Sequence, residues 1–374
     1  MMINQVMILF SMKKILHITY KMNTGGAEMF LMNVYRTIDR SKFQFIFLCS
    51  GNKKFDLEDE IIELGGKVIR TPDVKDVGPI KHIRNLKKII KDEKIDVINA
   101  QTYYNSMFSM IAGKLSMVKV RIVHSHTTQN GFDTSFKKII YQKISKLIIN
   151  NLSTKRLACE ENAGKSLFTK KFTVIKNGIV LDKFKFNNPL RIKYRNELKI
   201  NDSTTVIGHV GRLDKVKNHE FLIDTFNEYR KMNKDSALLL IGDGKLMSEL
   251  KDKVSKMNIT KNVIFLGNQS KANEFYNVMD YFVFPSLYEG LPLTLIEAQT
   301  NGLNCLISDT IEKNVKLTDS INFYSLNKSA KDWATKITSM NIKRADNYKN
   351  MNESEYNIDK VVKQLESIYS GQSI

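Results

Sequence analysis

The chain has 374 residues, 42% of them hydrophobic and 26% charged, which suits two globular domains and excludes a disordered or fibrous chain. The three cysteines, Cys49, Cys159 and Cys305, are odd in number and far apart, so they form neither a disulfide framework nor a metal-ligand spacing and favour a reducing cytosol. No apolar run reaches the roughly 18 residues of a membrane span, and residues 1–12 lack the basic region and cleavage site of a signal peptide.

The net charge of +19 is unevenly distributed. Residues 1–185 hold 32 Lys and Arg against 16 Asp and Glu, a net charge of +16, whereas residues 186–374 hold 26 against 23, a net charge of +3. A basic half beside a nearly neutral half indicates an anionic partner, either nucleic acid or an acidic membrane surface. A general lysine bias is the alternative explanation.

In the first half of the chain, apolar segments of strand length alternate with amphipathic segments of helix length. The expected strands are 14–19, 43–49, 95–100, 120–124, 156–159 and 172–175. The expected helices include 27–38, 80–91 and 136–150. Unbroken apolar strands that alternate with helices predict a parallel sheet covered on both faces.

The alternation restarts after a linker and short helix at 181–200. The second set of expected strands is 204–210, 237–241, 263–266, 281–284 and 305–308, which completes the run. The helices between them are 220–232, 246–257, 272–277 and 293–300. We therefore expect an α/β protein of two doubly wound Rossmann-like domains facing across a cleft, with ligands at the carboxyl ends of the strands. The boundaries are 1–185 for the first Rossmann-like domain, 186–356 for the second, and 357–374 for a C-terminal helix returning to the first.

Two features at expected strand ends of the first half are candidate binding sites. Gly25 and Gly26 open the first helix, where free N–H groups favour an anion or a cluster of hydroxyls, although an ordinary tight turn explains them equally well. His124 and His126 end a later strand and would point into the cleft, with a purely structural role as the alternative.

Cations follow the first strand of the second half. Arg212 lies directly after this strand and Lys217 lies just before the next helix. A guanidinium fork and an ammonium group both suit phosphate oxygens, which predicts a diphosphate clamp rather than solvated surface charge. Gly242 follows the next strand, and Asp243 beside it is predicted to form a turn.

The strongest signal is the segment from Glu289 to Glu297. Gly290 and Pro292 prevent one continuous helix, and proline is tolerated in a helix's first turn, so Glu289 should lie in a loop and Glu297 about one turn inside the helix. A carboxylate on such an apolar helix is costly unless a polar group bonds to it. Sugar and ribose hydroxyls are suitable partners.

These motifs resemble those of the family-four retaining glycosyltransferases of the GT-B fold, in the capsule and exopolysaccharide branch. The likeness covers nearly the whole chain and is strongest at 206–309, which includes an aspartate, Asp280, before a strand. The family's glutamate pair matches Glu289 and Glu297, and its Gly-Arg-Leu…Lys pattern matches Arg212 and Lys217.

The resemblance implies roles for individual residues. Arg212 and Lys217 would hold the donor diphosphate, Glu289 the donor sugar and Glu297 the ribose. The catalytic set would be His126, Arg212, Lys217 and Glu289, with His124 as the rival to His126. The remaining donor-binding residues would be Gly25, Gly26, Gly242, Gly290 and Leu291. Such enzymes typically need no metal or other cofactor, only the nucleotide-sugar co-substrate.

The implied reaction is retaining transfer of a hexosyl or N-acetylhexosaminyl group from a nucleotide-diphosphate sugar, with UDP the commoner nucleotide in the branch. The acceptor would be a glycan or lipid-linked molecule of surface polysaccharide synthesis. A sugar-nucleotide epimerase of related fold is the main alternative. A non-enzymatic nucleic-acid-binding protein would explain the basic charge but not the glutamate segment, and no such recognition motif is present. We therefore expect no nucleic-acid partner.

The segment 136–152 combines four lysines with apolar residues at helical spacing. A basic amphipathic helix of this kind suits an anionic lipid surface. A helix packed into the core with a solvated lysine face is the alternative. The first interpretation predicts a cytoplasmic protein bound peripherally at the inner face of the membrane.

Overall fold

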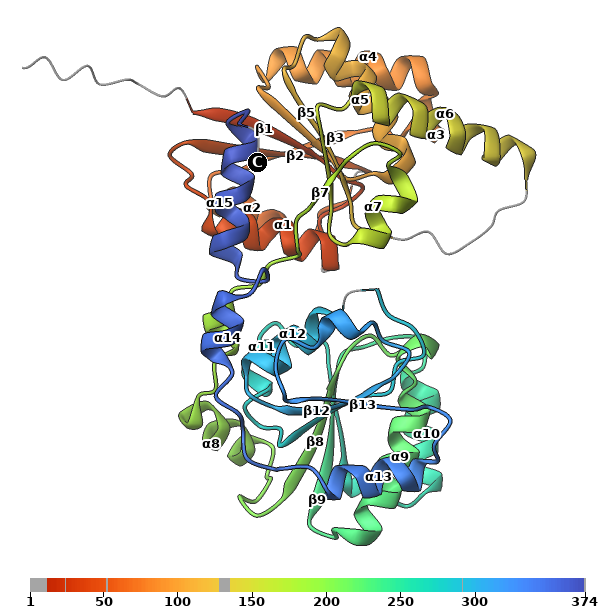
Figure 1. Cartoon of the computed structure of the whole chain (residues 1–374), viewed down its shortest axis with the longest axis vertical. Coiled ribbons are helices and arrows are strands. Elements are labelled where there is room, and N and C mark those ends of the chain that lie inside the picture. The colour runs from red at the N-terminus through yellow and green to blue at the C-terminus, as the bar shows by residue number, and fades with distance from the viewer. Residues whose placement is uncertain (1–11, 24, 52, 128–134, 291, 373–374) are drawn as a thin grey trace, which may run out of the picture. The chain divides into compact units, whose positions relative to one another are not determined.

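The computed structural model describes residues 12–23, 25–51, 53–127, 135–290 and 292–372, which form two compact units. The first unit comprises Met1–Gly178 and Ile358–Ile374, and the second comprises Ile179–Asn357. Each is a parallel sheet flanked by helices (Figure 1). The prediction of two doubly wound α/β domains is confirmed.

The sheet of the first unit has seven parallel strands in the order β3-β2-β1-β4-β5-β6-β7. The strands are β1 (Lys13–Ile18), β2 (Phe43–Ser50), β3 (Lys67–Thr71), β4 (Val97–Ala100), β5 (Val120–Ser125), β6 (Lys155–Ala158) and β7 (Thr173–Val174). The order reverses between β1 and β4, and ligands of such sheets bind at the carboxyl ends of the strands beside this reversal.

Helices cover both faces of the first sheet. They are α1 (Gly26–Thr37), α2 (Glu58–Glu63), α3 (Val74–Val77), α4 (Pro79–Asp92), the short η1 (Tyr103–Asn105), α5 (Ser106–Leu115), α6 (Phe136–Leu152), α7 (Glu161–Leu167) and the C-terminal α15 (Ile358–Tyr369). Helix α5 lies between α4 and α6, and α15 packs beside α1 (Figure 1). The Tyr369 side chain of α15 is fully buried, and its hydroxyl accepts a 3.2 Å hydrogen bond from Asn99.

The second sheet has six strands in the order β10-β9-β8-β11-β12-β13, with its reversal between β8 and β11. The strands are β8 (Thr205–Val210), β9 (Ser236–Ile241), β10 (Val263–Gly267), β11 (Tyr281–Phe284), β12 (Asn304–Ser308) and β13 (Ile321–Tyr324). The helices are η2 (Leu181–Phe184), α8 (Asn188–Glu197), η3 (Lys215–Lys217), α9 (His219–Met232), α10 (Met247–Lys256), η4 (Thr260–Asn262), α11 (Ala272–Phe275), α12 (Leu293–Thr300), η5 (Lys313–Val315), α13 (Ala330–Thr338) and α14 (Tyr348–Glu353).

The sequence pattern missed one edge strand in each sheet. β3 and β13 are each paired on one side only, and most of their side chains are partly exposed, so neither reads as an unbroken apolar run. The expectation that the strand at 305–308 completes the second run is therefore wrong, because β13 follows it and pairs with β12. None of the helices in the described ranges combines the length and the hydrophobicity that a membrane-spanning segment requires.

Candidate active site

Two loops at the carboxyl ends of β8 and β11 are joined side by side. The Asn218 side chain donates a 3.1 Å hydrogen bond to the carbonyl oxygen of Pro285. The backbone N–H of Leu287 donates a 2.8 Å hydrogen bond to the carbonyl oxygen of Val216. Asn218 has a left-handed backbone (φ 56°), which ends η3 and starts α9. The segment after β8 and the segment before α12 therefore form one surface at the reversal point of the sheet.

Lys217 and Glu289 meet on this surface. Their Nζ and Oε1 atoms are 2.7 Å apart, and the two side chains are only 16% and 13% exposed. The Lys217 ammonium also lies 4.8 Å from the centre of the Phe284 ring. An ion pair shielded from water is screened weakly by salt, so an entering phosphate or sugar would bind directly beside strong charges of both signs.

Arg212 is placed differently from Lys217. Its side chain is 77% exposed and lies 3.2 Å from the Asp214 carboxylate. An exposed pair of this kind contributes little stability, so the guanidinium can turn toward a ligand at small cost. The predicted clamp therefore consists of one fixed and one exposed cation.

The glycine after β9 allows two loops to pack closely. Gly242 has a φ of +129°, and a Cβ atom added to it would lie 2.1 Å from the carbonyl oxygen of Gly211. The Asp243 carboxylate accepts a 2.7 Å hydrogen bond from the N–H of Gly244, but the hydrogen-bonded turn that follows runs from Gly244 to Met247, so the prediction that Asp243 forms a turn is wrong. These contacts give Gly242 a packing role, and its donor-binding role stays a prediction.

Glu297 occupies the position that the sequence predicts. Helix α12 begins at Leu293, so Glu297 lies about one turn inside it and Glu289 lies in the loop before it. The Tyr276 hydroxyl donates a 2.6 Å hydrogen bond to Glu297 Oε2. Burial raises the pKa of Glu297 from 4.5 to about 7, and the Tyr276 hydrogen bond opposes this rise. Gly290 lies in the loop between the glutamates, and Leu291 lies outside the described residues.

A buried histidine that the sequence reasoning missed supports this surface. The His209 ring stacks on Phe284, with ring centres 5.2 Å apart, and its Nδ1 lies 2.9 Å from the Val283 carbonyl oxygen. That carbonyl can only accept, so Nδ1 carries the proton and Nε2 is an acceptor. Burial and the nearby His219 lower the His209 pKa well below 6.5, so the ring is neutral beneath Lys217. The available signal was a histidine one residue from the end of an apolar strand.

The glycines of the first unit lie at the start of α1. Gly25 precedes the helix and Gly26 is its first residue. A Cβ atom on Gly25 would lie 2.3 Å from Glu28 Oε2, so the Glu28 carboxylate folds back over the helix start. Negative charge already present there favours a hydroxyl ligand over a phosphate.

His124 and His126 lie together at the end of β5. Their ring centres are 4.0 Å apart, and both rings contact Phe30. His124 is 1% exposed, whereas His126 is partly exposed. Burial lowers the pKa of His126 to about 4, against the opposing effect of Asn177, so both rings are neutral near pH 7. The catalytic role of His126 stays a prediction. Throughout the described part of the chain, no three His, Cys, Asp or Glu side chains cluster as metal ligands would.

Comparison with known proteins identifies the family. The family profile described as "Glycosyltransferase Family 4" matches residues 24–183, and the profile "Glycosyl transferases group 1" matches residues 191–358. The chain is 35% identical over 312 residues to EpsF of Bacillus subtilis (strain 168), which is named as a glycosyltransferase; the match covers 82% of this chain and 81% of EpsF. The chain belongs to the family-four glycosyltransferases. The predicted family and enzyme class are confirmed.

Other relatives of this family-four glycosyltransferase come from polysaccharide synthesis. The capsular polysaccharide biosynthesis glycosyltransferase CapH of Staphylococcus aureus is 27% identical, over 97% of this chain and 100% of CapH. Among solved structures, Anabaena HepE in complex with UDP is 16% identical, with a TM-score of 0.78 over 96% of this chain and 100% of HepE. The latter likeness shows the fold alone, which is GT-B as predicted. The protein is a glycosyltransferase of the capsule and exopolysaccharide type.

Proposed function

We propose that this glycosyltransferase transfers a hexosyl or N-acetylhexosaminyl group from a UDP-sugar to a glycan or lipid-linked acceptor, with retention of configuration at the anomeric carbon. The observation that carries the proposal is the shielded Lys217–Glu289 ion pair at the reversal point of the second sheet. HepE binds UDP and UDP-glucose, and an Escherichia coli relative, 27% identical over 79% of each chain, is named as a transferase from UDP-Gal to a GlcNAc-diphosphoundecaprenol. Both support the same class of donor.

In this proposal each charged side chain binds a different part of the donor. The Lys217 ammonium and the Arg212 guanidinium bind the diphosphate and stabilise the charge that develops as the bond to the anomeric carbon breaks. The Glu289 carboxylate accepts hydrogen bonds from hydroxyls of the donor sugar, and Glu297 accepts them from the ribose. The acceptor hydroxyl attacks from the face that the diphosphate leaves, and its proton passes to the departing phosphate oxygen.

A donor screen tests the proposal directly. The purified chain is heated with UDP-, GDP- and ADP-sugars, and we expect UDP-sugars to raise the unfolding temperature most. The best donor is then incubated alone and with lipid-linked glycans, and NMR of the product reads the anomeric configuration. Isomerised sugar nucleotide from the donor alone would indicate the epimerase alternative, and an inverted product would contradict retention.

The raised pKa of Glu297 predicts that UDP binds more tightly as the pH rises. Ribose hydroxyls bond best to the ionised carboxylate, which forms as the pH passes through about 7. The folding stability of the free protein changes in the opposite direction to UDP affinity. The raised pKa of Glu297 contributes stability that is fully present below about pH 4.5 and is lost as the pH rises through about 7.

Calorimetric titration of UDP from pH 6 to 8 measures the effect, with Glu297→Gln as the matched control because phosphate protonation affects both proteins equally. We expect affinity to rise about fivefold more in the wild type than in the variant between pH 6 and 8, the effect of lowering a pKa of about 7 by about one unit on binding. If the affinities of the wild type and of Glu297→Gln change with pH in parallel, the ribose does not bind Glu297.

We also propose that the first unit binds an anionic membrane surface through α6. The helix carries four lysines and no acid, and it leaves several apolar side chains in solvent: Phe136 is 75% exposed and Leu147 is 65% exposed. Another face of α6 packs against the core through Ile149, Ile148 and Leu152, so the alternative of a core-packed helix holds for that face. The layer of α4, α5 and α6 (Figure 1) adds the five basic residues of α4, opposed by Asp92 alone. Adjacent positive charge and exposed apolar groups fit an enzyme working at the inner face of the membrane.

Sedimentation with liposomes tests the membrane proposal. At low salt we expect binding to phosphatidylcholine vesicles that contain phosphatidylglycerol, weakened by about 1 kcal/mol for each lysine removed from α6. The test variant reverses Lys137, Lys138, Lys143 and Lys146 to glutamate. The matched control reverses four exposed lysines of the second unit, Lys234, Lys251, Lys256 and Lys261. If both variants lost vesicle binding equally, the net charge of the protein alone would explain the binding. That result would contradict a specific membrane-binding surface on α6.

A further inference from the structure

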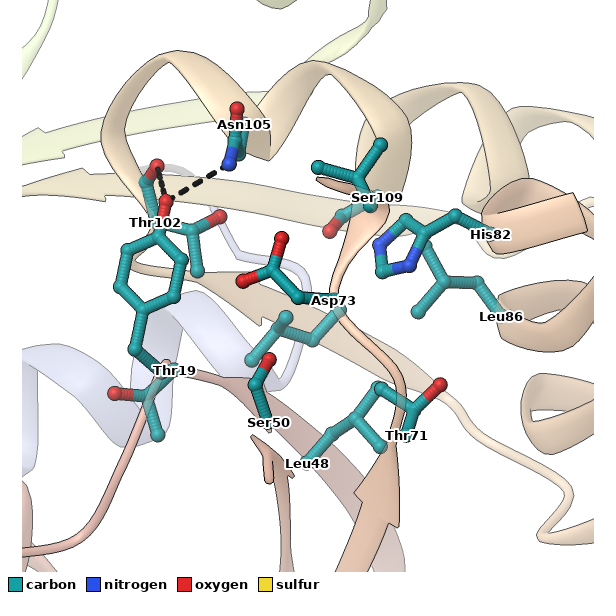
Figure 2. A pocket seen from close by; sticks show the side chains of 13 residues that line it. Thr19, Leu48, Ser50, Thr71, Asp73, His82, Leu86, Thr102, Asn105 and Ser109 are labelled. Carbon is teal, nitrogen blue, oxygen red and sulfur yellow. Dashed lines mark hydrogen bonds between the residues drawn. The ribbon is translucent and has the colours of Figure 1, made fainter. Parts of the chain in front are cut away.

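A small hollow lies at the carboxyl ends of β1, β2, β3 and β4, beside the reversal point of the first sheet. Figure 2 shows the Asp73 carboxylate near its centre, ringed by the side chains of Ser50, Thr71, His82 and Thr102. Apolar side chains form part of the wall, and the hollow has room for about one water molecule or hydroxyl group. Asp73, Ser50, Thr71, His82 and Thr102 were not singled out from the sequence.

One wall of the hollow is held rigidly by hydrogen bonds. The Tyr20 hydroxyl donates a 3.3 Å bond to the Thr102 carbonyl oxygen and accepts a 2.9 Å bond from the Asn105 amide (Figure 2). The Tyr141 hydroxyl of α6 donates to the oxygen of the same amide. Both the nitrogen and the oxygen of the Asn105 amide therefore form hydrogen bonds within the protein. We assign Asn105 to the shape of the hollow and not to ligand recognition.

Other polar groups keep bonding capacity. One Asp73 oxygen accepts a 3.2 Å bond from the N–H of Lys75 and caps α3, which leaves its second oxygen available. The Thr71 hydroxyl is buried, in a residue 7% exposed, and has no hydrogen-bond partner among the described residues. His82 Nδ1 lies 3.2 Å from the Pro72 carbonyl oxygen, so Nδ1 carries the proton and Nε2 is an acceptor. A buried hydroxyl without a partner is costly, and a bound ligand would remove that cost.

The charge of the lining selects the class of ligand. Asp73 is the charged group of the hollow, and none of the described residues that line it is a lysine or arginine, although the unit as a whole is strongly basic. Burial, and after it the nearby Asp73 carboxylate, raise the pKa of Tyr20 in the wall of the hollow. A phosphate or sugar acid would be repelled there, whereas hydroxyl groups can donate to Asp73 and bond to Thr71.

We propose that this hollow binds the hydroxyl edge of a neutral sugar residue of the acceptor. The inference rests on the proposed function, which places the donor on the cations of the second unit and leaves the acceptor to the first. The specificity determinants are Asp73, as hydrogen-bond acceptor, and Thr71, whose hydroxyl the fold leaves unpartnered. Thr71 is the last residue of β3 and Asp73 lies in the loop after it. The residues proposed to recognise the acceptor therefore lie at the end of this edge strand.

Saturation-transfer NMR on the full chain tests the inference with methyl glycosides, which lack a tail that could adhere to α6. The panel contains methyl glycosides of glucose, galactose, N-acetylglucosamine and N-acetylgalactosamine, with methyl glucuronide and methyl glucosaminide as charged comparisons. We expect at least one neutral glycoside to bind and the glucuronide not to bind. Asp73→Asn should weaken binding on the order of tenfold to a hundredfold, the effect of losing a hydrogen bond to a charged group.

Two features separate recognition from folding. Asparagine caps helices as well as aspartate, so Asp73→Asn should keep its unfolding temperature. Thr71→Val removes a hydroxyl that bonds to no described residue, so a purely structural role predicts unchanged or higher stability and unchanged binding. We expect weaker glycoside binding in both variants with UDP binding intact.

Several results would overturn the assignment. They are no glycoside bound by a chain that binds UDP, equal binding by wild type and both variants, binding of the glucuronide, and binding of the cationic glucosaminide alone. Absence of UDP binding in the wild type would instead contradict the proposed donor, so failure of the hollow and failure of the proposed function remain distinguishable.

Discussion

Replacement of Lys217 by alanine is expected to lower the turnover of sugar transfer about 10²–10³-fold, the usual effect of removing one preorganised charge partner from a developing anion. Lys217 is the cation that the fold fixes in place, since its ammonium lies 2.7 Å from Glu289 and over the Phe284 ring. Arg212 is 77% exposed, so it must move to reach a diphosphate, and its loss should have a smaller effect. Initial rates with saturating donor and acceptor measure the difference.

Lys215 is a matched control for this experiment. It lies on the same short helix, η3, two residues before Lys217, but is exposed. Lys215→Ala should retain turnover within about threefold, because exposed charges are screened by solvent and salt. The removal of Lys217 leaves the Glu289 carboxylate unpaired and mostly buried, so unfolding temperature must be measured as well. Unchanged turnover in Lys217→Ala, or a larger loss in Lys215→Ala, would contradict the assigned clamp.

The fold was predictable where burial on both faces makes the sequence pattern strong. Central strands such as β9 and β11 are buried along their whole length, so they read as continuous apolar runs between helices. Edge strands do not have this pattern. β3 contains Lys67 and Arg70 and pairs with β2 alone, so tertiary pairing rather than local sequence makes it a strand.

The contents of the donor surface were predictable, but its geometry was not. The motifs indicated Lys217 and Glu289 separately, as a phosphate ligand and a sugar ligand, and sequence spacing gives no reason for the two to form one ion pair. Their contact depends on β8 and β11 being neighbours, which is a property of sheet order. The hollow around Asp73 depends in the same way on four strand ends converging, so no local motif could indicate it.

Loss of Asp280 is expected to have the largest effect on stability. This residue before β11 was noticed only as part of the family resemblance, and the structure shows what it does. Its carboxylate is 2.6 Å from Arg191 and 2.7 Å from Arg195, and it accepts a 2.7 Å hydrogen bond from the N–H of Val206. The Arg195 side chain is completely buried and also donates to backbone carbonyl oxygens of the loop before β8.

Asp280→Ala should therefore lower the free energy of unfolding of the second unit by about 3–5 kcal/mol, because breaking a buried pair leaves its cations uncompensated. A third guanidinium, that of Arg344, increases the penalty: burial and then the neighbouring Arg191 lower its pKa to about 9, while Asp280 opposes that shift. Asp280→Asn should cost less, since an amide oxygen can still accept from the Val206 N–H.

Urea unfolding followed by tryptophan fluorescence measures this effect within one unit. The chain contains a single tryptophan, Trp333, which is fully buried in the second unit, so its emission does not report on the first. With a urea dependence of about 2 kcal/mol per M, the transition midpoint should fall by roughly 2 M in Asp280→Ala. The matched control is Asp224→Ala, which breaks a partly exposed 2.7 Å pair with Lys253 in the same unit and should cost no more than about 1 kcal/mol. Equal midpoints in the two variants would mean that water or repacking compensates the arginines, and that Asp280 is not what holds α8 against the sheet.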